Sequence, residues 1–270
     1  MKRTLILLTG ICLALTSLAQ EDSTKQESDT LRIGSMIIIK KGGDNDPEVR
    51  ISNRRSYRPS PISTNWGIVD IGFANYDDKT DYSSTDAQTF APGSTRDWFK
   101  VRQGKSVNVN IWIFMQRLNV YKNVVNLKYG LGVELNNYRY TNRIKYLTDP
   151  KTMVIMDTST TYEKNKLAAD YVTIPMMLNF NFTPNRKNGF GLSIGASAGY
   201  LYNARQKTIT AANDKEKNHD DFDLRDWKIS YIAELQLGPV KLYGSLATQS
   251  MFERGLDQVP YNVGIRLSNW

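Results

Sequence analysis

Hydrophobic and polar residues alternate with a period of two through most of the chain after residue 64. In residues 105–116, for example, Val107, Val109 and Ile111 alternate with polar residues, most of them asparagine or serine. This period places successive side chains on opposite faces of a strand, whereas a helix would repeat every three or four residues. The pattern therefore predicts strands. Eight stretches carry it, at residues 65–76, 105–116, 124–140, 166–182, 190–202, 226–237, 240–250 and 261–270.

The connections between these strands alternate in length. The long ones are residues 77–104, 141–165 and 203–225, with residues 251–260 intermediate. The short ones are residues 117–123, residues 183–189 and the pair Gly238-Pro239. An even number of strands, with long loops on one rim and short turns on the other, is typical of bacterial transmembrane barrels, whose short turns face the periplasm. The predicted fold class is all-β: an eight-stranded antiparallel up-and-down transmembrane β-barrel with a short periplasmic N-terminal extension.

Two arrangements of the apolar face fit the alternation, because it can point to lipid or into a soluble core. An eight-stranded barrel has an interior just wide enough for side chains to fill. The apolar faces carry several large residues on every strand, and packing all of them inside would overfill that space. The opposite face is rich in Gly, Ser and Asn, which suits a narrow lumen. This comparison favours an apolar face toward lipid, with an exported lipocalin-like barrel around an apolar cavity as the alternative.

Aromatic residues lie near many of the predicted strand ends. Such residues form girdles at the two membrane interfaces of outer-membrane barrels. The residues predicted for these girdles are Trp66, Tyr76, Tyr138, Tyr140, Tyr171, Tyr200, Tyr202 and Trp227.

The N-terminal residues predict export. Lys2 and Arg3 precede an apolar stretch at residues 5–15 and a small-residue cleavage site at 17–19, so residues 1–19 are interpreted as a signal peptide. Cys12 lies within the apolar stretch and follows Ile11, where lipid attachment would need a small residue, which disfavours a lipoprotein. Removing this leader takes away the only Cys, so the exported chain has no disulfide.

The exported chain divides into an extension, residues 20–63, and the barrel, residues 64–270. Within the extension, an apolar island at residues 36–39 and an alternating stretch at 49–51 predict a small hairpin in an otherwise flexible segment. A basic cluster of Arg50, Arg54, Arg55 and Arg58 follows, which we expect to be solvated or to contact anionic lipid or a partner protein.

Several short motifs point to a known family. They are the sequence Gly72 to Tyr76 at the end of the first strand, the sequence 171–175 in the fourth, the Gly-rich fifth strand and an aromatic final residue. From about residue 65 to residue 270 the chain resembles the Bacteroidetes outer-membrane β-barrel proteins of the PorT-like kind. The resemblance implies an outer-membrane location and varied roles, with protein secretion linked to the founding member.

The same resemblance implies that barrel-assembly machinery reads the last strand. The residues of this signal would be Val263, Ile265, Leu267 and Trp270. Trp270 is out of phase with the other three by one residue, which departs from the family pattern.

Six charged residues fall on the predicted inward face of the barrel. They are Lys128, Glu134, Lys228, Glu234, Lys241 and Arg266. Unpaired charges in a narrow lumen would be unfavourable, so we expect a hydrogen-bonded and salt-bridged plug. The alternative is a polar conduit for small ions.

Candidate chemistry elsewhere is sparse. His219 lies in a charged long loop, where a rim-site lipid-modifying enzyme would place such a residue, but no serine elbow accompanies it. Asp220, Asp221 and Asp223 do not match the spacing of a twelve-residue calcium loop. The chain also lacks a phosphate-binding glycine loop, zinc-ligand spacing and a dinucleotide fingerprint, so the sequence predicts no cofactor and no metal site.

Composition and charge narrow the function classes. Hydrophobic residues make up 40% of the chain, which excludes a wholly disordered protein, and the formal net charge is +8. Export makes nucleic acid an improbable partner despite this charge. The sequence predicts a monomeric, non-enzymatic structural or interaction component of the envelope, with secretion assistance implied by the resemblance alone. Expected partners are outer-membrane lipid and lipopolysaccharide, the assembly machinery, and a periplasmic or secretion partner bound through residues 20–63. The alternatives are a small passive channel, a lipid-modifying enzyme and a soluble binding barrel.

Overall fold

The computed structural model describes residues 60–184, 186, 189–212 and 214–268, together with the backbone of residues 30–33 and 36–39. The chain forms two compact units, Met1–Ser56 and Tyr57–Trp270, and each is described by itself. The predicted signal peptide lies outside the described residues.

The first unit contains a two-stranded antiparallel sheet. Its strands are β1 (Thr30–Ile33) and β2 (Met36–Ile39), with Thr30 opposite Ile39. The predicted apolar island is therefore a strand, and its partner in the structure is the segment that precedes it. Residues 49–51, which were expected to pair with the island, lie outside the described residues.

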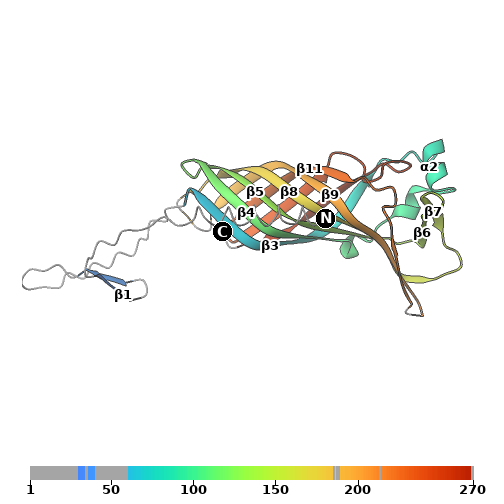
Figure 1. Cartoon of the computed structure of the whole chain (residues 1–270), viewed down its shortest axis with the longest axis horizontal. Helices are drawn as coiled ribbons and strands as arrows, with labels where there is room; N and C mark the ends of the chain where they lie inside the picture. Colours follow the sequence, from blue (N-terminus) through green and yellow to red (C-terminus); the bar gives the residue numbers. More distant parts are fainter. Residues whose placement is uncertain are drawn as a thin grey trace, which may run out of the picture. The chain divides into compact units, whose positions relative to one another are not determined.

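The second unit is a closed ring of eight antiparallel strands (Figure 1). In ring order they are β3 (Ile62–Asp78), β4 (Val107–Tyr121), β5 (Val125–Arg139), β8 (Tyr162–Asn181), β9 (Phe190–Thr210), β11 (Trp227–Leu237), β12 (Val240–Ala247) and β13 (Gln258–Leu267). The ring closes because β13 pairs with β3, which leaves no free sheet edge within it. The predicted fold class is confirmed.

The two rims of the ring differ as the loop lengths predicted. One rim carries only short turns, including Gly238-Pro239, where Gly238 adopts a φ of 64° that glycine tolerates best. The long connections gather at the other rim (Figure 1). They contain α2 (Thr85–Phe90), η1 (Arg96–Phe99), η2 (Gln103–Lys105) and the hairpin of β6 (Ile144–Leu147) with β7 (Met153–Met156).

Two strands run well past their predicted ends at the long-loop rim. β8 begins at Tyr162 and β9 continues to Thr210, where it also pairs with β10 (Lys215–His219). These extensions were expected to be loop, because their polar and charged side chains hide the period of two. The expectation was wrong, since backbone pairing continues there regardless of how polar the side chains are.

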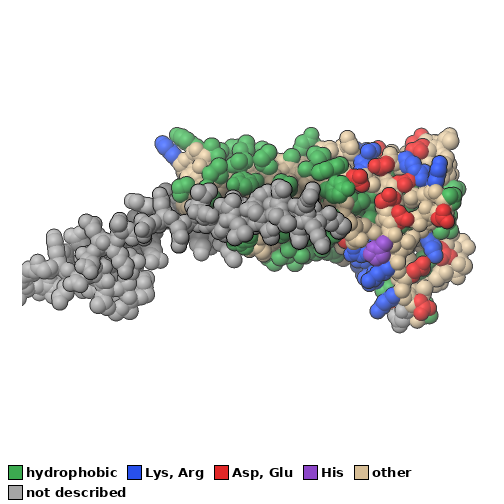
Figure 2. All heavy atoms as spheres, in the orientation of Figure 1, with side chains coloured by type: hydrophobic (Ala, Val, Ile, Leu, Met, Phe, Trp, Pro, Cys, Tyr) green, Lys and Arg blue, Asp and Glu red, His purple; other side chains and the backbone are tan. Residues whose placement is uncertain are grey.

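The apolar face of the ring lies outside. Ile174 and Met176 on β8 are 58% and 61% exposed, while Pro175 between them is buried on the inner face. Apolar side chains cover the strands in Figure 2, and charged side chains gather toward the long-loop rim. This orientation agrees with the predicted lipid-facing surface and contradicts the alternative of a soluble barrel around an apolar cavity. No described helix has the length and apolar composition needed to cross a membrane.

One strand changes phase partway along its length. The register of β4 against β5 shifts between Trp112 and Phe114, which is a β-bulge. Met115 was expected on the apolar outward face, but it is fully buried, whereas Phe114 packs on the outside against Trp66. The extra residue in the bulge, Ile113, causes this exchange of faces.

The predicted aromatic girdles are correct for half of their members. Trp66, Tyr200, Tyr202 and Trp227 are exposed on the outer surface. The other four, Tyr76, Tyr138, Tyr140 and Tyr171, are buried inside the barrel, and the prediction was wrong for them. Strand-end position alone does not determine the face on which an aromatic residue lies.

Candidate functional site

The lumen contains a chain of alternating charges centred on Arg266 of β13. Its Nε and Nη2 atoms donate to the two carboxylate oxygens of Asp70, both at 2.7 Å, and Nη1 donates to Glu234 Oε2 at 2.5 Å. The other oxygen of Glu234 accepts from Lys128 Nζ at 2.5 Å. All four side chains are buried, and the bidentate geometry is the strongest form of an arginine–carboxylate pair.

A second buried ion pair joins Lys228 of β11 to Glu134 of β5. Glu134 Oε1 also accepts hydrogen bonds from the amides of Asn262 and Asn136, both at 3.1 Å. The ammonium of Lys228 lies 5.0 Å from the centre of the Tyr171 ring. This carboxylate is therefore held by one cation and two amides, which offsets the penalty of burying it.

The sixth predicted lumen residue, Lys241, is also buried, and its Nζ donates to Ser268 Oγ at 2.5 Å. The structure thus places all six charged residues inside the barrel and joins five of them in two clusters of ion pairs. Asp70, which the sequence analysis did not select, is the principal partner of Arg266. The same alternation that selected the other six also places Asp70 on the inward face of its strand.

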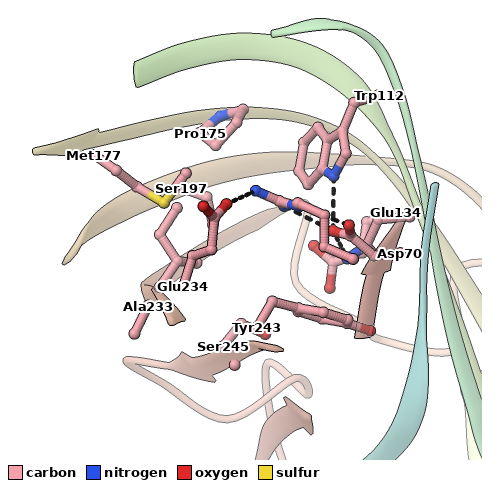
Figure 3. A pocket seen from close by; sticks show the side chains of 14 residues that line it. Asp70, Trp112, Glu134, Pro175, Met177, Ser197, Ala233, Glu234, Tyr243 and Ser245 are labelled. Atoms are coloured by element: carbon pink, nitrogen blue, oxygen red, sulfur yellow. Dashed lines mark hydrogen bonds and ion pairs between the residues drawn. The ribbon is translucent and has the colours of Figure 1, made fainter. Parts of the chain in front are cut away.

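Little empty space remains around Arg266 and its two carboxylate partners. A cavity of about 20 Å³ lies among the charged residues, lined in part by Asp70, Trp112, Glu234, Tyr243 and Arg266 (Figure 3). Such a volume holds about one water molecule. Tyr243 donates to Asn108 at 2.5 Å and Trp112 donates to Asp70 at 2.7 Å, so bulky side chains also fill the level of the network.

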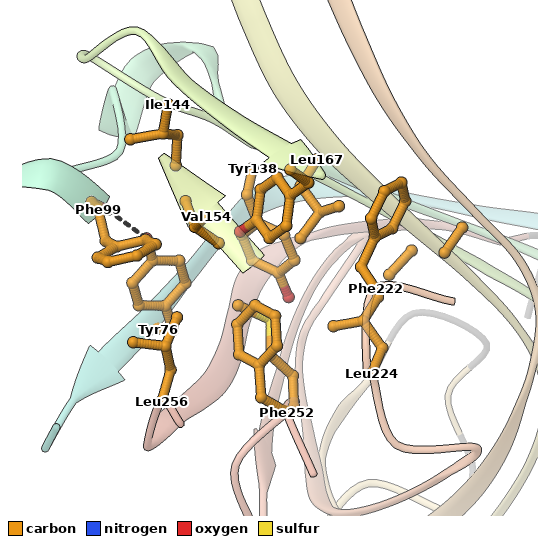
Figure 4. Packing of buried hydrophobic residues seen from close by; sticks show 14 of the residues in the cluster. Tyr76, Phe99, Tyr138, Ile144, Val154, Leu167, Phe222, Leu224, Phe252 and Leu256 are labelled. Carbon is orange, nitrogen blue, oxygen red and sulfur yellow. Dashed lines mark hydrogen bonds between the residues drawn. The ribbon is translucent and has the colours of Figure 1, made fainter. Parts of the chain in front are cut away.

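Above the network, toward the long-loop rim, an aromatic cluster fills the barrel (Figure 4). We call it the aromatic cap. Its aromatic members are Tyr76, Phe90, Phe99, Tyr138, Tyr140, Tyr146, Tyr171, Phe222 and Phe252. They come from the strands and from all four connections at this rim, so the cap ties the loops to one another.

Three tyrosine hydroxyls of the cap form hydrogen bonds within it. Tyr76 donates to the backbone carbonyl of Phe99, and the hydroxyls of Tyr140 and Tyr146 lie 2.8 Å apart. Burial raises the pKa of Tyr146, so its hydroxyl stays neutral across the physiological range. Phe252 contacts Phe90 edge-on, with ring centres 5.6 Å apart, and stacks on Tyr146.

The residues considered for catalysis or metal binding do not converge. His219 is exposed on β10, and its Nδ1 lies 3.3 Å from Asn203 Oδ1. Asp223 is paired with Arg254 at 2.5 Å, while Asp220 and Asp221 accept local backbone hydrogen bonds. The described residues contain no group of three or more His, Cys, Asp or Glu side chains suited to a metal ion.

The proposed assembly signal lies on the outer face of β13. Val263, Ile265 and Leu267 are exposed there, and Trp270 lies outside the described residues. The basic cluster of residues 50–58 lies outside them as well.

Comparisons with known proteins identify a family and similar solved structures. The model of a family described as "Outer membrane protein beta-barrel domain" matches residues 69–259. A search of curated proteins finds no match. Among solved structures, the attachment invasion locus protein Ail of Yersinia pestis, in complex with the heparin analogue sucrose octasulfate, is 11% identical with a TM-score of 0.29. That match covers 75% of this chain and 99% of Ail.

Proposed function

The chain belongs to the outer membrane protein beta-barrel domain family, its barrel lies in the outer membrane, and we propose that it acts there as a non-enzymatic structural or interaction component of the envelope. The observation that carries this proposal is the filled lumen. With a filled lumen, the protein would contact other envelope components through its long-loop rim, its lipid-facing belt and its N-terminal extension.

The filled lumen argues against the passive-channel alternative. A channel needs a continuous aqueous path, but the residues around Arg266 leave a cavity of only about 20 Å³ there. The aromatic cap closes the barrel a second time toward the long-loop rim. Each closure uses residues from several strands or loops, so a single side-chain rotation would not open a path.

Single-channel recording in planar bilayers tests this part of the proposal. We expect the folded protein, identified by its faster migration before heating on a gel, to be electrically silent. The variant Glu134→Ser/Lys228→Ser/Phe252→Ala, folded by the same criterion, tests whether the assay detects a loosened lumen. Discrete conductance steps from the folded wild-type barrel would contradict the proposal.

A finer assignment, to the PorT-like proteins of Bacteroidetes with a role in protein secretion, is part of the proposal. It is supported by the resemblance carried by Gly72 to Tyr76, residues 171–175 and the Gly-rich strand β9. In this scheme residues 20–63 reach a periplasmic or secretion partner, because β3 starts at the short-turn rim. The outer face of β13, with Val263 and Ile265, would engage the assembly machinery.

Secretion can be measured in a host strain that lacks the chain. We expect the amount of exported protein in the medium to fall and to be restored by the complete chain, but not by a chain that lacks residues 20–63 behind the leader. The shortened barrel must first be recovered from the outer membrane in its folded, heat-shifted form. Unchanged secretion in the deletion strain would remove this role and leave the envelope component alone.

The lipid-modifying alternative has little support from the geometry. His219 is exposed, and its described polar contact is the side chain of Asn203, an amide rather than a nucleophile. Asn203 in turn donates to Asp170, which is engaged by Arg205. This set joins β8, β9 and β10 by polar contacts and offers no activated hydroxyl.

A further inference from the structure

The extended part of the barrel wall carries a line of positive charges set by the strand register. Arg139 of β5 lies directly opposite Lys166 of β8, which lies opposite Lys207 of β9, which lies opposite Lys217 of β10. We call these four residues the cation row. The row crosses four neighbouring strands, and with strands about 4.8 Å apart it spans roughly 14 Å.

The cation row faces outward. Residues directly opposite each other on paired strands lie on the same face of the sheet. The residues beside the row in sequence, such as Leu167, Gln206 and Thr208, are buried on the inner face. The four cations therefore project from the outer wall of the barrel.

The row lies just beyond the apolar belt. The last apolar residue on the outward face of β5 is Leu135, four residues before Arg139, which is about 13 Å along the strand and less along the axis of a tilted barrel. On β9 the exposed Tyr202 precedes Lys207 by five residues. Figure 2 shows Lys and Arg side chains gathered beside the histidine where the apolar surface ends. This is the depth of lipid headgroups.

The protein does not neutralise the row itself. Arg139 donates to the backbone carbonyl of Glu163 at 2.9 Å, and Lys166 donates to the amide oxygen of Asn137. Among the described residues, none of the four cations forms an ion pair with a carboxylate. Two acidic side chains on these strands are engaged by other cations, because Asp170 pairs with Arg205 and Glu216 with Lys145.

Further cations reinforce the same surface. Lys164 lies two residues from Lys166 and Lys215 two residues from Lys217, so both share the outward face of the row. Like charges directly opposite each other destabilise a sheet. A row of this kind within an exposed wall is therefore unfavourable unless an anion from outside the protein lies against it.

We propose that the cation row binds the phosphate groups of a phosphorylated glycolipid in the membrane leaflet at the long-loop rim. The charge is complementary, the depth matches a headgroup, and the length of the row suits more than one phosphate. The inference rests on the outer-membrane placement of the barrel but on no particular role for its loops.

Native mass spectrometry of the barrel in an uncharged detergent, titrated with diphosphoryl lipid A, tests the proposal. The test variant is Lys166→Gln/Lys207→Gln/Lys217→Gln. The control is Lys79→Gln/Lys105→Gln/Lys151→Gln, which removes the same charge from exposed loop positions at the same rim. Each cation near an anionic surface contributes about a fivefold change in affinity, so we expect the test variant to bind roughly a hundredfold more weakly. The control should bind within about threefold of wild type.

Three results would overturn the proposal: equal losses in both variants, equal binding of a lipid A sample from which the phosphates have been removed, or full competition by inorganic phosphate or a soluble sulfated polysaccharide. The last result would make the ligand a soluble anion. Heat-shifted migration of every variant establishes that the barrel is folded. A silent barrel with no lipid preference would refute this inference alone, whereas a conducting barrel would refute only the proposed function.

Discussion

The charged network and the aromatic cap fill the same barrel by different means. The network is built from strand residues, whose spacing is fixed by backbone hydrogen bonds, so that Arg266 can meet Asp70 and Glu234 with bidentate geometry. The cap is built largely from loop residues such as Phe90, Phe222 and Phe252. Apolar packing is non-directional and tolerates the looser positions of loops. The contrast teaches that charges are buried where backbone hydrogen bonds fix the positions of residues most closely. The loops, whose positions are fixed less closely, close the barrel by hydrophobic packing.

The largest expected effect is from breaking the network. Arg266→Met leaves Asp70 and Glu234 buried without their guanidinium, and we expect it to lower the free energy of unfolding by about 3–5 kcal/mol. Urea unfolding in phosphatidylcholine vesicles, followed by tryptophan fluorescence, measures this change. Adding Asp70→Asn should restore most of the loss, since Glu234 keeps its ion pair with Lys128 and no uncompensated charge then remains.

An exposed ion pair serves as the control for that experiment. Lys100 lies 2.5 Å from Asp97 on the surface of a long loop, and Lys100→Gln should change the same free energy by less than about 1 kcal/mol. If Arg266→Met were no more destabilising than Lys100→Gln, the importance given to the buried network would be wrong.

The next largest effect is expected from a substitution that opens the aromatic cap. Phe252→Ala removes a fully buried ring that contacts Phe90 and Tyr146, a change that typically lowers stability by about 3 kcal/mol. Because the cap ties loops together, we expect the loss to appear as local opening. Limited proteolysis should cut the long loops of this variant faster while the strands stay protected. Simultaneous cleavage within the strands would show instead that cap and network unfold together.

The pH dependence of stability should distinguish the aromatic cap from the charged network by a smaller effect. Burial raises the pKa of Tyr146 above the ordinary value of 10.0, so the neutral hydroxyl is favoured in the folded cap. The contribution of the neutral Tyr146 hydroxyl to the stability of the cap is complete below pH 10. It declines as the pH rises further, because the unfolded chain then loses a proton that the folded cap retains. For one tyrosine the decline is at most about 1.4 kcal/mol per pH unit. Proteolysis of the loops across this range measures it, with Tyr146→Phe, which should show a weaker dependence, as the control.

The sequence predicted the barrel well because period-two alternation is local. Lys128 and Glu234 could be placed inside from their own strands, but their pairing depends on a register between distant strands that the alternation does not contain. Asp70 had the correct phase and was overlooked. Tyr171 is a similar case. The alternation placed it on the same inward face as Thr173, but its position near a predicted strand end suggested an interfacial girdle.

Other features could not be read from local pattern. Met115 is inside because a bulge at Ile113 inserts one residue, and nothing in the alternation marks that insertion. The cap brings together Phe90, Phe222 and Phe252, which lie in separate loops and meet only after the ring closes. The cation row is likewise a product of register, since Lys166 and Lys207 are far apart in sequence and were expected in or near loops.

The seam between β3 and β13 also has a consequence for the order of events during biogenesis. It joins the first and last strands of the ring, and Arg266 lies directly opposite Asp70 across it. Until the final strand arrives, both Asp70 and Glu234 lack their guanidinium, and the sheet keeps two open edges. The ring therefore closes and these carboxylates gain their guanidinium in the same step. A chain that lacks the final strand has no intermediate in which the buried charges of the lumen are all paired.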